Sequence, residues 1–75
     1  MINILIIEDD TALSNGIVYA LKDDNFAFVQ AFDLATAKEQ IKSNSFDLII
    51  LDINLPDGNG FELLADIRRT LDTPV

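Results

Sequence analysis

Four consecutive large apolar residues, Leu48 to Leu51, end directly at a carboxylate, Asp52. An uninterrupted apolar run of this length is typical of a strand that is buried on both faces of a parallel sheet. The residues at positions 56 to 60 include one proline and two glycines, which favour a turn. A charged side chain at the end of a buried strand costs free energy unless another group compensates it. The sequence therefore predicts a buried strand that ends at Asp52, followed by a loop.

The rest of the chain alternates between apolar runs and amphipathic segments. We expect strands over residues 2–7, 26–31 and 48–51, and helices over residues 11–22, 34–43 and 60–70. Asp10 or Thr11 can cap the first helix, and Asp33 can cap the second. Residues 73–75 resemble the start of a further strand.

Spacings of three and four residues predict the buried face of each helix. In the first helix, the expected face is Leu13, Ile17, Ala20 and Leu21. In the second helix, it is Leu34, Ala37 and Ile41. In the third helix, it is Phe61, Leu64, Ile67 and Leu71.

The order of strands and helices predicts an α/β fold with a parallel sheet. Right-handed connections and the apolar character of the first strand favour the strand order 2-1-3, with the first two helices on opposite faces. The second strand is then added on one side of the first strand and the third strand on the other side, so the direction in which the sheet grows reverses between the first and third strands. Ligands of open α/β sheets bind at such a reversal, beyond the carboxyl ends of the strands.

Acidic residues follow both strands at this reversal. Glu8, Asp9 and Asp10 follow the first strand, and Asp52 follows the third. Two carboxylates about 4 Å apart repel by about 4 kcal/mol at an intermediate dielectric, so one takes up a proton unless a cation is bound. The chain has no histidine and no cysteine. Oxygen ligands alone favour Mg²⁺, with Mn²⁺ as an alternative.

The composition excludes several other classes of function. The formal net charge is −8, which argues against a nucleic-acid surface on this segment. The apolar runs are too short to cross a membrane, and the N-terminus lacks the basic region of a signal peptide. We therefore expect a cytoplasmic protein.

Two segments, Ile4–Asp10 and Phe46–Leu64, together resemble the receiver domain of a two-component response regulator. The resemblance implies a flavodoxin-like parallel sheet, of which this chain has the N-terminal β-α-β-α-β-α part. It implies that Asp52 accepts a phosphoryl group from a histidine kinase. It also implies that Mg²⁺ is held by the carboxylates of Asp9 and Asp52, by the backbone carbonyl of Asn54, and by Glu8 through a water.

The chain also departs from the family pattern. A receiver domain has five strands and five helices, so residues 1–75 are expected to be a partial domain without strands 4 and 5, helices 4 and 5 or an effector domain. The Ser or Thr and the Lys with which the family contacts the phosphoryl group lie in the missing part, so we expect weak phosphotransfer. The strand over 48–51 becomes a sheet edge, and such an edge favours self-association or pairing with a complementary fragment. DNA binding and control of transcription are expected of an effector domain in the full-length protein.

Other functions remain as alternatives. An aspartate-nucleophile phosphohydrolase also forms an aspartyl phosphate, but it usually has a second Asp where this chain has Asn54. A fragment with an idle pocket would act only as an interaction module. A calcium-binding EF-hand loop is excluded because Asp57 stands where that loop needs glycine. A nucleotide-binding α/β module is not supported, because no glycine-rich phosphate loop follows the first strand. We expect a phosphoacceptor with at most self-catalysed phosphotransfer and dephosphorylation, and not a true enzyme.

Overall fold

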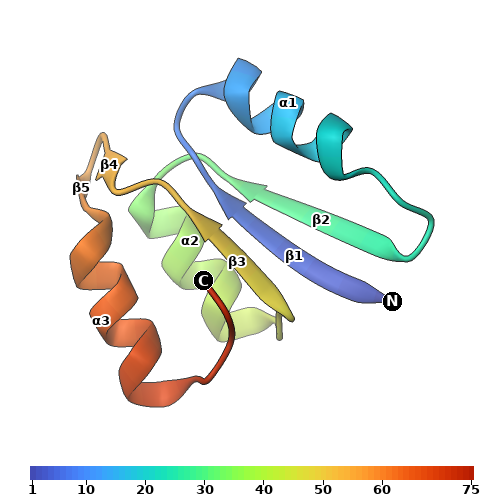
Figure 1. The fold of residues 1–75 in the computed structure, drawn as a ribbon. Helices are drawn as coiled ribbons and strands as arrows, with labels where there is room; N and C mark the ends of the chain where they lie inside the picture. Colours follow the sequence, from blue (N-terminus) through green and yellow to red (C-terminus); the bar gives the residue numbers. More distant parts are fainter.

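The computed structural model describes residues 1–75, apart from the side chain of Thr70. Its elements follow the chain in the order β1 (Ile2–Ile7), α1 (Thr11–Leu21), β2 (Phe26–Ala31), α2 (Leu34–Ser43), β3 (Leu48–Leu51), β4 (Asn54–Leu55), β5 (Gly58–Asn59) and α3 (Gly60–Thr70) (Figure 1). The expected strands and helices are confirmed to within one residue. Strands β4 and β5 were not expected.

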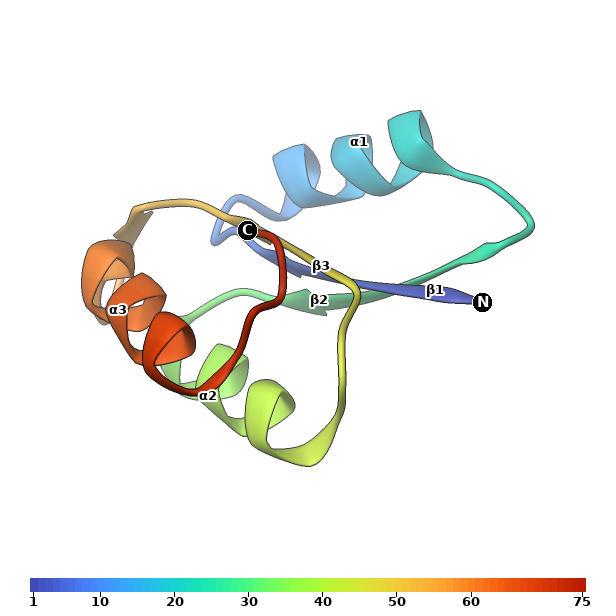
Figure 2. The ribbon, with the colours of Figure 1, turned by 60° about the horizontal axis from the view of Figure 1, so that its bottom comes forward.

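The main sheet is parallel, with the strand order β2-β1-β3. This confirms the α/β fold and the strand order predicted from the sequence. Helix α1 covers one face of the sheet, whereas α2 and α3 lie together on the other face (Figure 2). Because both faces of β1 are covered, its residues Ile4 to Ile7 are all buried.

The core lies between the sheet and the pair α2 and α3. Leu5 and Ile7 of β1 and Ile49 of β3 pack there with residues from the helices, the end of β2 and β4, namely Ala31, Leu34, Ala37, Leu55, Leu63 and Ile67. The expected buried face of α2 is confirmed by Leu34 and Ala37, with Ile41 partly buried against this core.

The expected buried face of α3 is only partly right. Ile67 is buried, but Phe61 is 60% exposed and Leu71 is also exposed. Leu63 is buried in place of Phe61, with a spacing of four residues to Ile67. The helix is therefore rotated relative to the expected face, so that Leu63 and Ile67 enter the core.

The expected buried face of α1 is mostly wrong. Leu13, Ala20 and Leu21 are exposed and Ile17 is only partly buried, whereas the polar residue Ser14 is fully buried. The reason is a hydrogen bond: the side-chain amide of Gln30 on β2 donates to Oγ of Ser14 at 2.8 Å and to Oδ1 of Asn15 at 2.9 Å. A buried hydroxyl with a partner is tolerated, so a polar residue takes the place nearest the sheet.

Strand β3 is one of the two edges of the sheet, β2 being the other, and part of the β3 edge is already paired. The amide of Ile49 donates to the carbonyl oxygen of Pro74 at 2.8 Å, and Oγ1 of Thr73 donates to the carbonyl oxygen of Phe46. Residues 73–75 thus lie against β3 as the expected strand would, without being a regular strand. Among the described residues, no helix has both the length and the apolar character needed to cross a membrane.

Candidate functional site: an acidic cluster at the carboxyl edge of the sheet

Strands β1 and β3 end at the same level, which brings their acidic residues together. Ile7 pairs with Leu51 at the last position of the parallel ladder. The amide of Asp52 then donates to the carbonyl oxygen of Ile7 at 2.8 Å. Glu8 and Asp9 leave β1 at this point, so their side chains start beside Asp52. The reversal in strand order therefore creates the predicted meeting of the two acidic segments.

The carboxylates of Glu8, Asp9 and Asp52 form one cluster. One carboxylate oxygen from each residue lies within 4.8 Å of the others. Glu8 is buried, with 8% of its surface exposed, Asp52 is half-buried, and Asp9 is exposed. This donor set consists only of oxygen atoms and is partly open to solvent, which suits a hard divalent cation that keeps some of its waters. The cluster can therefore hold a metal ion such as Mg²⁺.

The electrostatics of the cluster favour a cation. Burial raises the pKa of the Glu8 carboxyl above its usual 4.5, although a hydrogen bond from the amide of Asp10 opposes the shift. The negative charges of Asp52 and Asp9 raise this pKa further. Burial raises the pKa of Glu8 more than the repulsion from its neighbouring carboxylates does. A bound cation would stabilise the charged form of all three groups.

The side chains of Asp10 and Asn54 do not belong to this cluster, although the backbone amides of both residues bond to it. Asp10 caps α1, since its Oδ1 accepts a hydrogen bond from the amide of Leu13 at 3.1 Å. The amide of Asn54 donates to Oδ1 of Asp52 at 3.2 Å, while the residue itself is exposed. The backbone of Asn54 is thereby held next to the carboxylate of Asp52.

The loop after Asp52 is a small closed hairpin. Strands β4 and β5 pair antiparallel, with Asn54 opposite Asn59 and Leu55 opposite Gly58. The base is closed by a hydrogen bond of 2.8 Å from the amide of Gly60 to the carbonyl oxygen of Ile53. The sequence predicted a turn here, and the two-residue connection formed by residues 56 and 57 explains why the turn becomes a paired hairpin.

Gly60 is required by this closure. A Cβ atom at position 60 would lie 2.8 Å from the carbonyl oxygen of Asp52 and 2.8 Å from Cα of Ile53. Both are backbone atoms, which cannot move without moving the loop. Only glycine allows α3 to begin this close to the backbone of Asp52.

Asp57 has a role that the sequence analysis missed. Its Oδ1 accepts a hydrogen bond from the amide of Leu34 at 2.7 Å, and its Oδ2 accepts one from the amide of Ala35 at 3.1 Å. The Leu34 amide is the main reason that the pKa of Asp57 lies below its usual 3.8. The local pattern indicated only a turn residue, because the helix that Asp57 caps lies 22 residues earlier in the sequence.

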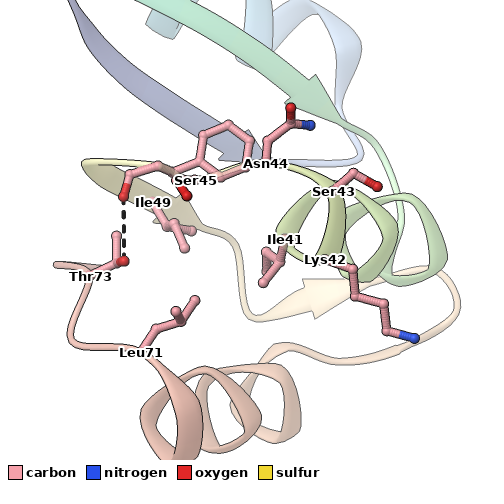
Figure 3. A pocket seen from close by; sticks show the side chains of 9 residues that line it. Ile41, Lys42, Ser43, Asn44, Ser45, Ile49, Leu71 and Thr73 are labelled. Atoms are coloured by element: carbon pink, nitrogen blue, oxygen red, sulfur yellow. Dashed lines mark hydrogen bonds between the residues drawn. The ribbon is translucent and has the colours of Figure 1, made fainter.

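The described residues also line a cavity of about 320 Å³ at the opposite end of β3 (Figure 3). It lies between the last turn of α2 and the residues after α3, with Ile41, Ile49, Leu71 and Thr73 among its walls. None of the residues that line it is acidic. The cavity is therefore separate from the acidic cluster.

Comparisons with known proteins agree with the fold. The chain is 42% identical over its whole length to the transcriptional regulatory protein CiaR of Streptococcus pneumoniae, and it spans about a third, 34%, of that relative's length. Two solved structures are similar. The non-phosphorylated HemR receiver domain of Leptospira biflexa has a TM-score of 0.84 and 35% identity, and the match covers 99% of this chain and 60% of that one. The MaeR response regulator bound to beryllium trifluoride has a TM-score of 0.80 and 36% identity, with coverage of 99% and 62%.

The match to a protein family extends over residues 4–75, and the family is described as the response regulator receiver domain. This range contains both acidic segments and, apart from Ile2 and Asn3 of β1, all the elements that position them. The chain belongs to the response regulator receiver domain family.

Proposed function

We propose that Asp52 accepts a phosphoryl group from a phosphohistidine of a sensor histidine kinase. In this proposal Mg²⁺ is held by the carboxylates of Asp9 and Asp52, by the backbone carbonyl of Asn54, and by Glu8 through a water. The observation that carries the proposal is the cluster in which carboxylate oxygens of Glu8, Asp9 and Asp52 lie within 4.8 Å of one another. Membership of the receiver family supports the same assignment.

For this phosphoryl transfer, the residues of the chain need only to position the reacting groups and to stabilise their charge. A carboxylate oxygen of Asp52 forms a bond to phosphorus as the bond between phosphorus and the imidazole nitrogen of the donor breaks. The nitrogen keeps the electron pair and later takes a proton from solvent, and the product is an aspartyl phosphate. A bound Mg²⁺ would neutralise charge on the phosphoryl oxygens. The hydrogen bond from the amide of Asn54 orients the Asp52 carboxylate.

The rival enzyme is supported less well. Phosphohydrolases with an aspartate nucleophile usually place a second Asp two residues later, where this chain has the exposed Asn54. We therefore propose a phosphoacceptor that at most catalyses its own phosphorylation and dephosphorylation.

We extend the proposal to control of transcription by the protein that contains this chain. The relative CiaR is named a transcriptional regulatory protein, and this chain spans 34% of it. With a formal net charge of −8, residues 1–75 are not suited to contact DNA themselves. DNA binding is therefore proposed for another part of such a protein.

Self-association through the edge of β3 is a separate proposal. The amide of Ile49 is paired with Pro74, and Leu51, two residues on, directs its backbone groups to the same side of the strand. A second copy or a complementary fragment can pair there. Light scattering over a dilution series tests this: a molar mass that falls on dilution is expected, and a constant monomer mass would contradict it. A chain that associates but neither binds Mg²⁺ nor accepts phosphate would be the interaction module considered above.

Labelling with a small phosphodonor tests the phosphoacceptor. We expect acetyl phosphate to add one phosphoryl group to Asp52, slowly and only with Mg²⁺ present, as read by intact mass and by the acyl phosphate's lability to hydroxylamine. Asp52→Asn should abolish the label. Asp24→Asn is the matched control, because it makes the same substitution at an exposed turn residue, and it should leave labelling unchanged. Labelling that survives Asp52→Asn would overturn the assignment.

A further inference from the structure

The tip of the hairpin after β3 is fastened to the first turn of α2 by one side chain. Both carboxylate oxygens of Asp57 are used, one on the amide of Leu34 and the other on the amide of Ala35. Gly58, the next residue, packs so closely on Leu34 that an added Cβ atom would overlap its Cδ1. Asp57 therefore holds together two segments that also pack closely at Gly58 and Leu34.

The start of α2 has a complete set of hydrogen-bond partners only because Asp57 is there. The first amides of a helix have no partner within the helix. The helix's own cap, Asp33, accepts the amide of Thr36 with its side chain at 2.7 Å and the amide of Ala37 with its backbone carbonyl at 3.1 Å. The amides of Leu34 and Ala35 donate their hydrogen bonds to the carboxylate of Asp57 instead. Two carboxylates thus share one helix start, but only Asp57 comes from the loop that follows Asp52.

The backbone pairs of the hairpin connect its tip to its base, so that the position of the tip limits the position of the base. Asp57 lies in the turn, and Leu55 and Gly58 form the pair next to it. The next pair contains Asn54, whose amide bonds to Asp52. The hydrogen bond from the amide of Gly60 to Ile53 closes the hairpin below this pair. A tip that is fixed on α2 therefore limits where the backbone of Asn54 can lie.

We propose that Asp57 is a positioning residue for the phosphorylation site. By fastening the hairpin to α2, it fixes the backbone carbonyl of Asn54 in the place where that oxygen can ligate Mg²⁺ beside Asp52. The inference rests on the proposed function, since it needs Asn54 to be a metal ligand. It gives α2 a part in the site, although no side chain of α2 belongs to the acidic cluster.

Two matched variants separate positioning from simple helix capping. Asp57→Ala and Asp33→Ala each remove one carboxylate cap from the same helix start. Only Asp57→Ala frees the hairpin. We expect the Mg²⁺ dissociation constant, measured by isothermal titration calorimetry, to rise about tenfold in Asp57→Ala, as for other groups that orient metal ligands. In Asp33→Ala it should stay near the wild-type value. Asp57→Asn, which keeps one acceptor oxygen, is the milder variant. Its Mg²⁺ dissociation constant should lie between those of wild type and Asp57→Ala.

A second measurement needs no metal. Amide hydrogen exchange of Gly60 reports the bond that closes the hairpin. In the metal-free chain we expect Asp57→Ala to speed this exchange relative to wild type, and Asp33→Ala to leave it unchanged. If the two variants have equal effects on exchange and on Mg²⁺ affinity, Asp57 is a helix cap only and the inference is overturned. If the wild-type chain does not bind Mg²⁺ at all, the proposed function fails and this inference fails with it.

Discussion

The amide of Asn54 donates a hydrogen bond to Oδ1 of Asp52 at 3.2 Å, while Asn54 as a residue is exposed. The backbone of Asn54 therefore lies next to the proposed acceptor, and under the proposed function its backbone carbonyl and not its side chain acts there. We predict that Asn54→Ala changes the Mg²⁺ dissociation constant by no more than about twofold, as for other surface substitutions.

Asp9→Asn is the contrasting variant, because it removes one of the carboxylates of the cluster. It should weaken Mg²⁺ binding by more than about tenfold. Calorimetric titration of both variants measures the difference. A large loss of affinity in Asn54→Ala would show that the side chain and not the backbone acts at the site.

The second prediction concerns Gly60. In Gly60→Ala the new Cβ would meet backbone atoms of Asp52 and Ile53 at 2.8 Å, so the hairpin must shift. We expect a loss of about 1–3 kcal/mol in the free energy of unfolding. Urea unfolding measures it, through a lower midpoint with an unchanged slope.

Gly16→Ala is the control for this substitution. Gly16 lies within α1, and an added Cβ there would have no neighbour within 4 Å. The same change should raise the free energy of unfolding by about 0.5–1 kcal/mol, because glycine is the poorer helix former. A Gly60→Ala variant as stable as wild type would contradict the close approach of α3 to Asp52.

The third prediction concerns pH. The amide of Leu34 holds the pKa of Asp57 below its usual 3.8, so the charged carboxylate binds the start of α2 better than the protonated form does. Its contribution to stability is therefore complete above about pH 4 and is lost as the pH falls through the lowered pKa. We expect Asp57→Asn to be less stable than wild type at neutral pH and the difference to shrink in acid. Urea unfolding across this pH range measures it, and a difference that grows in acid would contradict the prediction.

Much of the fold could be predicted from the sequence because its strands are unusually clear. The apolar runs at 2–7 and 48–51 have few polar interruptions, and Asp10 and Asp33 cap the helices that follow them as expected. The clustering of Glu8, Asp9 and Asp52 could be predicted from the strand order, because the carboxyl ends of neighbouring parallel strands lie at the same edge of the sheet.

The errors have physical causes that lie outside local patterns. Ser14 is buried in place of Leu13 because Gln30, on another strand, supplies its hydrogen bond. Leu63 is buried in place of Phe61 because packing against α2 decides the rotation of α3. Asp57 reaches a helix that precedes it by more than 20 residues, so no sequence window contains both partners. Contacts between distant segments decide each of these cases, and periodicity does not report them.

Under the proposed function, Asp52 lies in a magnesium site built from the ends of β1 and β3. The most direct measurement is a Mg²⁺ titration of the ¹⁵N-labelled chain, followed by the amide resonances in NMR. We predict saturable shifts that are largest at Glu8, Asp9, Asp52 and Asn54 and that disappear in Asp52→Asn. Shifts that are absent, or that are centred elsewhere and persist in Asp52→Asn, would contradict the claim.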